Sequence, residues 1–110
     1  MRRPAPTREI PPPLEVECLR ALWSIGKGSV RQVREELLVR KRDLAYTTVM
    51  TLLDRLERRG AVSRKKVSRM FVYEALLTRE AVRALAVKQL VDTFFDGESA
   101  DLAEYLKSEP

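Results

Sequence analysis

The chain has 110 residues, which is enough for one small domain with a modest apolar core, or for such a domain with an appended segment. Its 21 Lys and Arg exceed its 16 Asp and Glu, and the resulting net charge of +5 favours a polyanionic partner. With no histidine, no phosphate-binding glycine loop and no nucleophile beside a base, the sequence excludes the common enzyme classes and indicates no cofactor.

The basic charge is confined to one part of the chain. Residues 1–77 hold 17 Lys and Arg against 9 Asp and Glu, a net charge of +8, whereas residues 78–110 hold 4 against 7, a net charge of −3. We therefore expect any nucleic-acid surface in the first two thirds, and another role for the rest.

The single cysteine, Cys18, cannot form an internal disulfide or a metal site, which fits a reducing cytoplasm. Its place in an apolar helical pattern predicts a packing role rather than a reactive one. No stretch is apolar enough for a membrane span, and the N-terminus lacks the apolar core of a secretion signal. We expect a cytoplasmic protein without membrane insertion.

Two helices are predicted after a flexible basic arm at residues 1–10. Prolines at 11–13 favour a helix start, and the first helix should run from 14 to 25 and end at Gly26-Lys27-Gly28. Its predicted buried face consists of Leu14, Cys18, Leu19, Leu22 and Trp23. Ser29 and Gln32 have the spacing of a capping box, so a second helix should cover residues 30–39.

A charged link at residues 40–44 leads into a third helix, which Gly60 closes. This helix has two distinct faces. Its apolar stripe consists of Val49, Leu52, Leu53 and Leu56. Thr47, Met50, Thr51, Asp54 and Arg58 lie largely on the other side. The second and third helices form a helix-turn-helix unit, and we expect the third to lie in a DNA major groove.

Beyond Gly60 the hydrophobic period changes from 3.6 to 2. Residues 61–66 and 69–75 are predicted as strands around a turn at Val67-Ser68. Three helices followed by a basic hairpin is the element order of a winged helix. The charges at Arg64, Lys65, Lys66 and Arg69 could merely protect a sheet edge. Because they adjoin another basic face, contact with DNA phosphates is the favoured interpretation.

Thr78 is expected to cap a helix over residues 81–95, followed by a short helix over 99–106. The longer helix has too many apolar residues for its own domain to cover, so we infer a homodimer. The expected interface is Val82, Leu85, Ala86, Leu90, Val91, Phe94, Phe95, Leu102 and Leu106. The predicted fold is thus mainly α with a small β-hairpin: a winged helix-turn-helix domain at 11–77 and a helical dimerisation region at 78–110.

The sequence resembles the penicillinase-repressor (BlaI/MecI) family of bacterial winged-helix transcriptional regulators. The resemblance covers residues 11 to about 96. It rests on Leu-Arg-Ala-Leu-Trp at 19–23, Ser-Val-Arg-Gln-Val at 29–33, Ala-Tyr-Thr-Thr-Val-Met-Thr-Leu-Leu-Asp-Arg-Leu-Glu-Arg-Arg-Gly at 45–60 and Phe-Val-Tyr at 71–73. It implies a dimeric repressor of palindromic operators, ahead of β-lactamase, penicillin-response or related resistance genes.

The resemblance also implies roles for individual residues. It places Tyr46, Thr47, Thr48, Met50 and Thr51 at the groove. Some members carry Lys and Arg in place of Thr47 and Met50, so this uncharged groove face predicts a preference for A·T steps. In inducible members a membrane sensor triggers cleavage near the position of Thr93, Phe94 and Phe95. The asparagine found there in the best-known members is absent.

Two functions of different classes follow. The first is a DNA-binding repressor acting as a homodimer, with an inducing protease or sensor system as a candidate partner. Its expected DNA contacts are Arg31, Tyr46, Thr47, Thr48, Met50, Thr51, Arg55, Arg58, Lys65, Lys66 and Arg69. The alternative is a winged helix used only for protein contact. The salt dependence of binding separates the two, because contacts with phosphates weaken steeply as salt rises.

Overall fold

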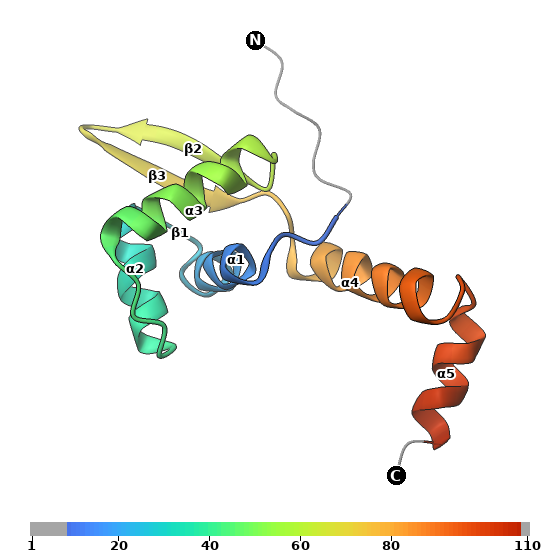
Figure 1. Ribbon diagram of the computed structural model, residues 1–110. Helices are drawn as coiled ribbons and strands as arrows, with labels where there is room; N and C mark the ends of the chain where they lie inside the picture. Colours follow the sequence, from blue (N-terminus) through green and yellow to red (C-terminus); the bar gives the residue numbers. More distant parts are fainter. Residues whose placement is uncertain (1–8, 109–110) are drawn as a thin grey trace.

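A computed structural model describes residues 9–108 of the chain (Figure 1). Most of the predicted arm therefore lies outside the described residues. The elements in order are α1 (Pro13–Ile25), β1 (Lys27–Gly28), α2 (Val30–Val39), α3 (Tyr46–Arg58), β2 (Val62–Val67), β3 (Met70–Ala75), α4 (Arg79–Phe94) and α5 (Ser99–Ser108). Three helices and a hairpin followed by two more helices confirm the predicted winged-helix fold class.

Helix α1 begins with a proline in its first turn and ends at Gly26, whose φ of 86° is the left-handed conformation that favours glycine. Cys18, Leu19 and Leu22 are buried, as predicted. The prediction for Leu14 is wrong, because that side chain is 38% exposed while the neighbouring Glu15 is buried. The buried face of α1 is thus rotated towards Glu15, which has an ion-pair partner described below.

Helix α2 starts at the predicted capping box. The Ser29 hydroxyl accepts from the Gln32 amide at 3.3 Å, and the Gln32 side chain accepts from the Ser29 amide at 2.9 Å. The link to α3 is fixed by Arg34, whose Nε donates to the Leu44 carbonyl at 2.8 Å. Helices α1, α2 and α3 pack around one core, so the start of α3 is held against α2.

The three strands form one antiparallel sheet in the order β1-β3-β2. Strand β1 was not predicted: its two residues were read as a helix end, and they pair with Glu74 and Tyr73 of β3. The hairpin turn also differs by one position. Val67 pairs with Met70, so the turn residues are Ser68 and Arg69. This register places Arg69 at the hairpin tip rather than in a strand.

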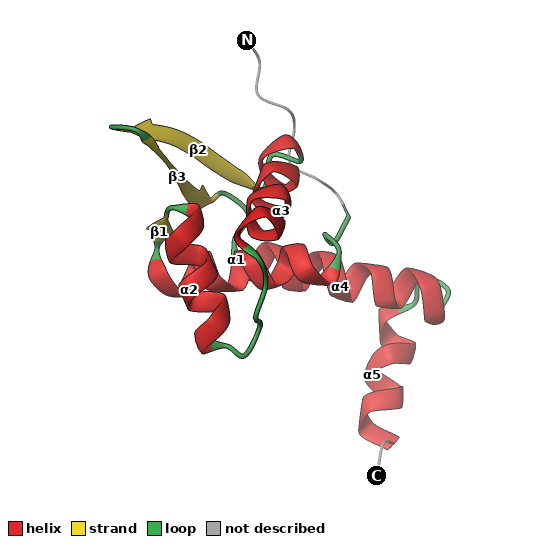
Figure 2. Cartoon of the chain, turned by 60° about the vertical axis from the view of Figure 1, so that its left-hand side comes forward, coloured by secondary structure: helices red, strands yellow, loops and turns green. Residues whose placement is uncertain are grey.

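Helix α4 leaves the winged-helix domain at a junction around Trp23. The Trp23 indole N–H donates to the Leu77 carbonyl at 2.9 Å, and the Arg79 guanidinium lies 5.0 Å from the centre of the indole ring. Beyond this junction α4 and α5 project away from the domain (Figures 1 and 2). The radius of gyration is 16.3 Å, whereas a compact chain of this length would have about 13 Å.

No helix among residues 9–108 is long and apolar enough to span a membrane.

Candidate nucleic-acid interface

Helix α3 has the two faces that its sequence predicts. Val49, Leu52, Leu53 and Leu56 are buried against α1, α2 and the sheet. The opposite face begins directly at the helix start, where Ala45 provides no side-chain cap for the first backbone N–H groups. The predicted groove residues Tyr46, Thr47, Thr48, Met50 and Thr51 are all exposed on this side. Their contact with bases stays a prediction.

The hydroxyl of Thr51 has a defined orientation. It donates to the Thr47 carbonyl at 3.0 Å, one helical turn earlier. Its hydrogen is therefore engaged within α3, and its oxygen is left as an acceptor beside its methyl group. An acceptor and a methyl group match the exocyclic amino group of adenine and the methyl group of thymine, respectively.

The predicted phosphate contacts fall into two groups. Arg58 pairs with Asp54 at 3.1 Å and Arg31 with Glu35 at 3.5 Å, each within its own helix. Phosphate contact by these arginines would compete with exposed ion pairs, which are weak. The other predicted cations, Arg55, Lys65, Lys66 and Arg69, are exposed and make no ion pair within residues 9–108.

The strand register divides the wing into two faces, because directly opposite residues in an antiparallel pair share a face. Arg64 lies opposite Tyr73, and Lys66 opposite Phe71. Tyr73 is buried against the domain core, so this is the inner face of the hairpin. Lys65, opposite Val72, points to the outer face. The two adjacent lysines therefore cannot contact the same phosphate in the same way.

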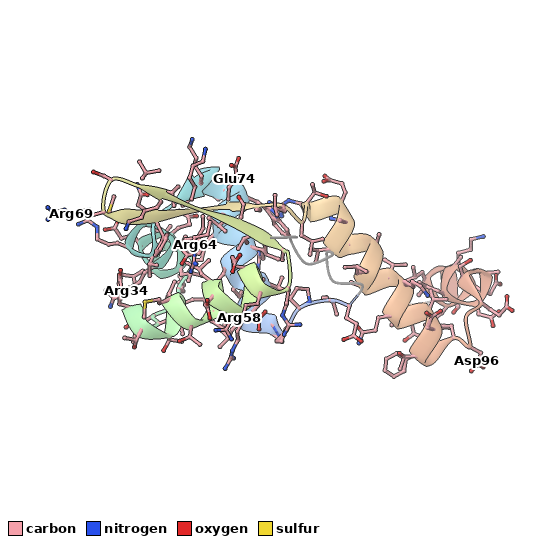
Figure 3. The ribbon with its side chains drawn as sticks, turned by 90° about the horizontal axis from the view of Figure 1, so that it is seen from above. Arg34, Arg58, Arg64, Arg69, Glu74 and Asp96 are labelled. Carbon is pink, nitrogen blue, oxygen red and sulfur yellow. The ribbon has the colours of Figure 1, made fainter. Side chains whose placement is uncertain are left out.

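Arg64 lies at the inner face, close to α3. Its guanidinium carbon is 4.3 Å from the centre of the Phe71 ring, within the range of a cation–π contact. Arg64 and Phe71 line a hollow of about 300 Å³ together with Met50, Thr51, Asp54 and Tyr73. Figure 3 shows Arg64 between the hairpin and α3, with Arg69 at the hairpin tip. The sequence placed Arg64 only among the basic wing residues.

A second contact not predicted from the sequence fixes the far end of α3. Arg59, the C-cap of α3, donates from Nε to Glu15 Oε1 at 2.7 Å and from Nη2 to Oε2 at 3.5 Å. The Glu15 side chain is only 2% exposed. The pair joins α1 to the end of α3, so it positions the helix that carries the predicted groove residues. The signal available in the sequence was a carboxylate within the apolar half of the first helix.

The single cysteine has the predicted packing role. Cys18 is fully buried in the core, and burial, together with the nearby Glu15 and Glu17 carboxylates, raises the pKa of its thiol to about 12. The neutral thiol is the unreactive form. Cys18 therefore acts as a small apolar side chain of α1.

The predicted dimer residues differ in how far their own chain covers them. Val82 is buried in the domain core, and Val91 is buried on α4. Leu85, Ala86, Phe95 and Leu102 are partly buried. Leu90, Phe94 and Leu106 are exposed, as are Val87 and Tyr105. Only the exposed and partly buried members offer substantial area to a partner. The Phe95 ring is in part covered within its own chain, because its centre lies 5.9 Å from the centre of the Tyr105 ring.

Comparison with known proteins decides the family. The model of the penicillinase repressor family matches residues 12–109, nearly the whole chain. The chain belongs to this family. It is 26% identical to the methicillin resistance regulatory protein MecI of Staphylococcus aureus over 83 residues. These residues make up 76% of this chain and 67% of MecI. The chain is 43% identical to the transcriptional regulator BlaI of Mycobacterium tuberculosis over 79 residues, and the matched part covers 70% of this chain and 56% of BlaI.

The solved structures support the fold. The DNA-binding domain of the repressor BlaI matches with a TM-score of 0.60 over 70% of this chain and 93% of that domain, at 23% identity. A MarR family protein from Bacillus stearothermophilus matches with a TM-score of 0.52 over 88% of this chain and 71% of its own, at 21% identity. At these identities the likeness concerns the fold alone.

Family membership shows the kind of protein to which the chain belongs. The chain is a DNA-binding transcriptional repressor of the BlaI/MecI type. The MecI and BlaI relatives are named as regulators, which is consistent with the prediction that the chain is not an enzyme. The chain spans about two thirds of the length of MecI and just over half of mycobacterial BlaI, so its operator, assembly and induction are matters of proposal.

Proposed function

We propose that this penicillinase repressor family member acts as a homodimer on an operator made of two inverted half-sites. Each protomer inserts α3 into a major groove, and bound dimers exclude RNA polymerase. The observation that carries the proposal is the exposed, uncharged face at the start of α3, next to a hairpin whose inner and outer faces both carry cations. Two-fold symmetry then requires half-sites about one helical turn, or a multiple of it, apart.

The groove residues and the basic residues have different roles in this proposal. Tyr46, Thr47, Thr48, Met50 and Thr51 read bases through hydroxyl oxygens, methyl groups and a thioether. Such groups favour A·T pairs, with Met50 and the threonine methyls against thymine methyls. The unpaired cations Arg55, Lys65, Lys66 and Arg69 contact phosphates and supply most of the affinity, with Arg31 and Arg58 available after release from their carboxylates.

The dimer forms through α4 and α5. Val87, Leu90, Phe94 and Leu106 leave an apolar surface exposed on the two helices that project from the winged-helix domain (Figure 1). Exposed apolar surface of this extent on a small acidic region favours a second copy of the same region, which buries it symmetrically. The genes controlled by the dimer, by analogy with the family name and with MecI, belong to β-lactam resistance or a related response.

The candidate proteolysis region lies where α4 ends. Thr93 and Phe94 are exposed in the protomer, and Phe95 is the C-cap. A cut there would separate α5 from α4 and remove part of the proposed interface. Induction by a protease or sensor system stays a prediction for this chain, and its direct test is limited proteolysis of the dimer followed by a measurement of its assembly.

Selection of binding sites from a randomised DNA duplex pool tests the proposal. We expect an A·T-rich inverted repeat. Thr51→Ala should leave folding and dimer formation intact and weaken binding to the selected site, because it removes an acceptor and a methyl group at the groove. Glu104→Gln, on the exposed surface of α5, is the matched control and should bind as the wild type does. Strongly G-rich half-sites would contradict the A·T preference, and failure to enrich any sequence would contradict the DNA function.

A further inference from the structure

One cation, Arg64, lines the hollow between the wing and α3, next to a part of α3 that has no basic residue. The exposed face of α3 carries no basic residue before Arg55. Arg64, from β2, lines the hollow beside Met50 and Thr51, which belong to that face. The wing therefore brings a guanidinium to the uncharged part of α3 (Figure 3).

The position of Arg64 along the hairpin separates it from the other basic wing residues. Arg64 is the third residue of β2 and pairs with the buried Tyr73, so it lies near the base of the wing. Lys66 and Arg69 lie farther out, next to or within the turn. With α3 in a groove, Arg64 would lie nearer to the bases than the wing tip does, because its hollow is also lined by Met50 and Thr51 of α3.

The orientation of Arg64 is held by the Phe71 ring at 4.3 Å. Phe71 is 43% exposed and is not part of the domain core, so core packing does not account for a large aromatic side chain here. The carboxylate nearest in the hollow, Asp54, is paired with Arg58 at 3.1 Å, and Arg64 makes no ion pair within the described residues. Its donors are therefore available to a ligand.

We propose that Arg64 reads a guanine at the edge of the half-site contacted by α3, and that Phe71 is its positioning residue. An arginine in the major groove donates two parallel hydrogen bonds to guanine O6 and N7, the commonest specific contact between proteins and DNA. Stacking on an aromatic ring restrains the guanidinium before binding, which lowers the entropic cost of that contact. The proposal rests on the groove-binding function above and adds one G·C pair to an otherwise A·T-rich half-site.

The test compares site selection and affinity for four full-length proteins: wild type, Arg64→Ala, Arg64→Lys and Phe71→Leu. Lys65→Ala is the matched comparison, because Lys65 is adjacent in β2 but points to the outer face; as a phosphate contact it should lose affinity equally on all duplexes and keep the guanine preference. Arg64→Ala should lose the guanine preference at one position of each half-site, about 5- to 150-fold in relative affinity, with the other positions unchanged. Arg64→Lys should keep the salt dependence of the wild type and retain only part of the same preference, since lysine can donate to guanine but lacks the planar fork that stacks on Phe71.

Phe71→Leu should reduce the preference at that same position, and should have no further effect when Arg64 is already alanine. The inference is overturned if Arg64→Ala weakens binding equally on selected and scrambled duplexes, which is the behaviour of a phosphate contact. It is also overturned if Arg64→Ala selects the wild-type motif. Both results leave the proposed function intact, whereas a wild type that enriches no sequence removes that function itself.

Discussion

The ion pair between Glu15 and Arg59 gives the sharpest prediction about folding. Arg59→Ala leaves the Glu15 carboxylate inside the protein without its partner, and an unpaired buried charge destabilises by about 3–5 kcal/mol. Because the Arg59 side chain is 35% exposed, water screens part of the interaction, and we expect a loss of about 2–3 kcal/mol in the free energy of unfolding. The melting temperature should then fall by about 8–12 °C.

Arg58→Ala is the matched control for this variant. Arg58 is the preceding residue, at the same end of α3, and its pair with Asp54 is 3.1 Å long, but its side chain is 76% exposed. An exposed pair one helical turn apart contributes only about 0.3–0.5 kcal/mol. Urea denaturation followed by circular dichroism measures the free energy of unfolding of both variants. All samples are kept at one protein concentration, because the stability of a dimer depends on concentration.

A further variant separates loss of the ion pair from loss of the arginine's packing. Glu15→Gln combined with Arg59→Ala replaces the stranded carboxylate by a neutral amide, so part of the stability lost in Arg59→Ala should return. Equal losses in Arg58→Ala and Arg59→Ala, or a loss below about 0.5 kcal/mol in Arg59→Ala, would refute the account of a buried pair that fixes the end of α3.

Three other results are expected. Leu90→Asp should convert the dimer to a folded monomer in analytical ultracentrifugation, because it places a charge in the proposed apolar interface; a monomeric wild type at micromolar concentration would refute the dimer. Cys18 should resist alkylation at pH 8 in the native protein and react in urea, since its thiol pKa is raised to about 12; rapid native labelling would contradict this. Lys66→Ala and Lys65→Ala should each lower the salt slope of DNA binding by about two, because each substitution removes one phosphate contact from each protomer of the dimer.

The sequence predicted the elements whose hydrophobic period is long and regular. The stripe from Val49 to Leu56 identified α3 and its exposed face, and the change of period after Gly60 identified the hairpin. Strand β1 was missed because two residues carry no period, and its existence depends on pairing with β3, far along the chain. The hairpin turn was misplaced by one residue because a lone serine, with no adjacent Gly, Asn or Asp, does not fix which two residues form the turn.

Contacts between distant residues were beyond the sequence. Glu15 and Arg59 are separated by 44 positions, and nothing local indicates that the two helices meet there. The same pair explains why Leu14 is exposed, because Glu15 takes the inward position at the start of α1. The stacking of Arg64 on Phe71 is a diagonal contact across the hairpin, since Arg64 pairs with Tyr73, and the side-chain orientation that produces it cannot be read from the pattern of residues. The exposed face of α3, by contrast, followed directly from helical spacing, whereas the placing of its residues in a DNA groove came from the family resemblance and stays a prediction.

The salt dependence of DNA binding tests the central claim most directly. Four of the cations predicted to contact DNA make no ion pair within residues 9–108 of each protomer, and these residues, Arg55, Lys65, Lys66 and Arg69, would give about eight phosphate contacts in the proposed dimer. Affinity for the selected inverted repeat should then fall about ten-thousand-fold between about 50 and 200 mM salt, with a logarithmic slope near −7. A flat response over this range would contradict DNA binding by α3 and the wing, and would favour a winged helix that binds protein instead.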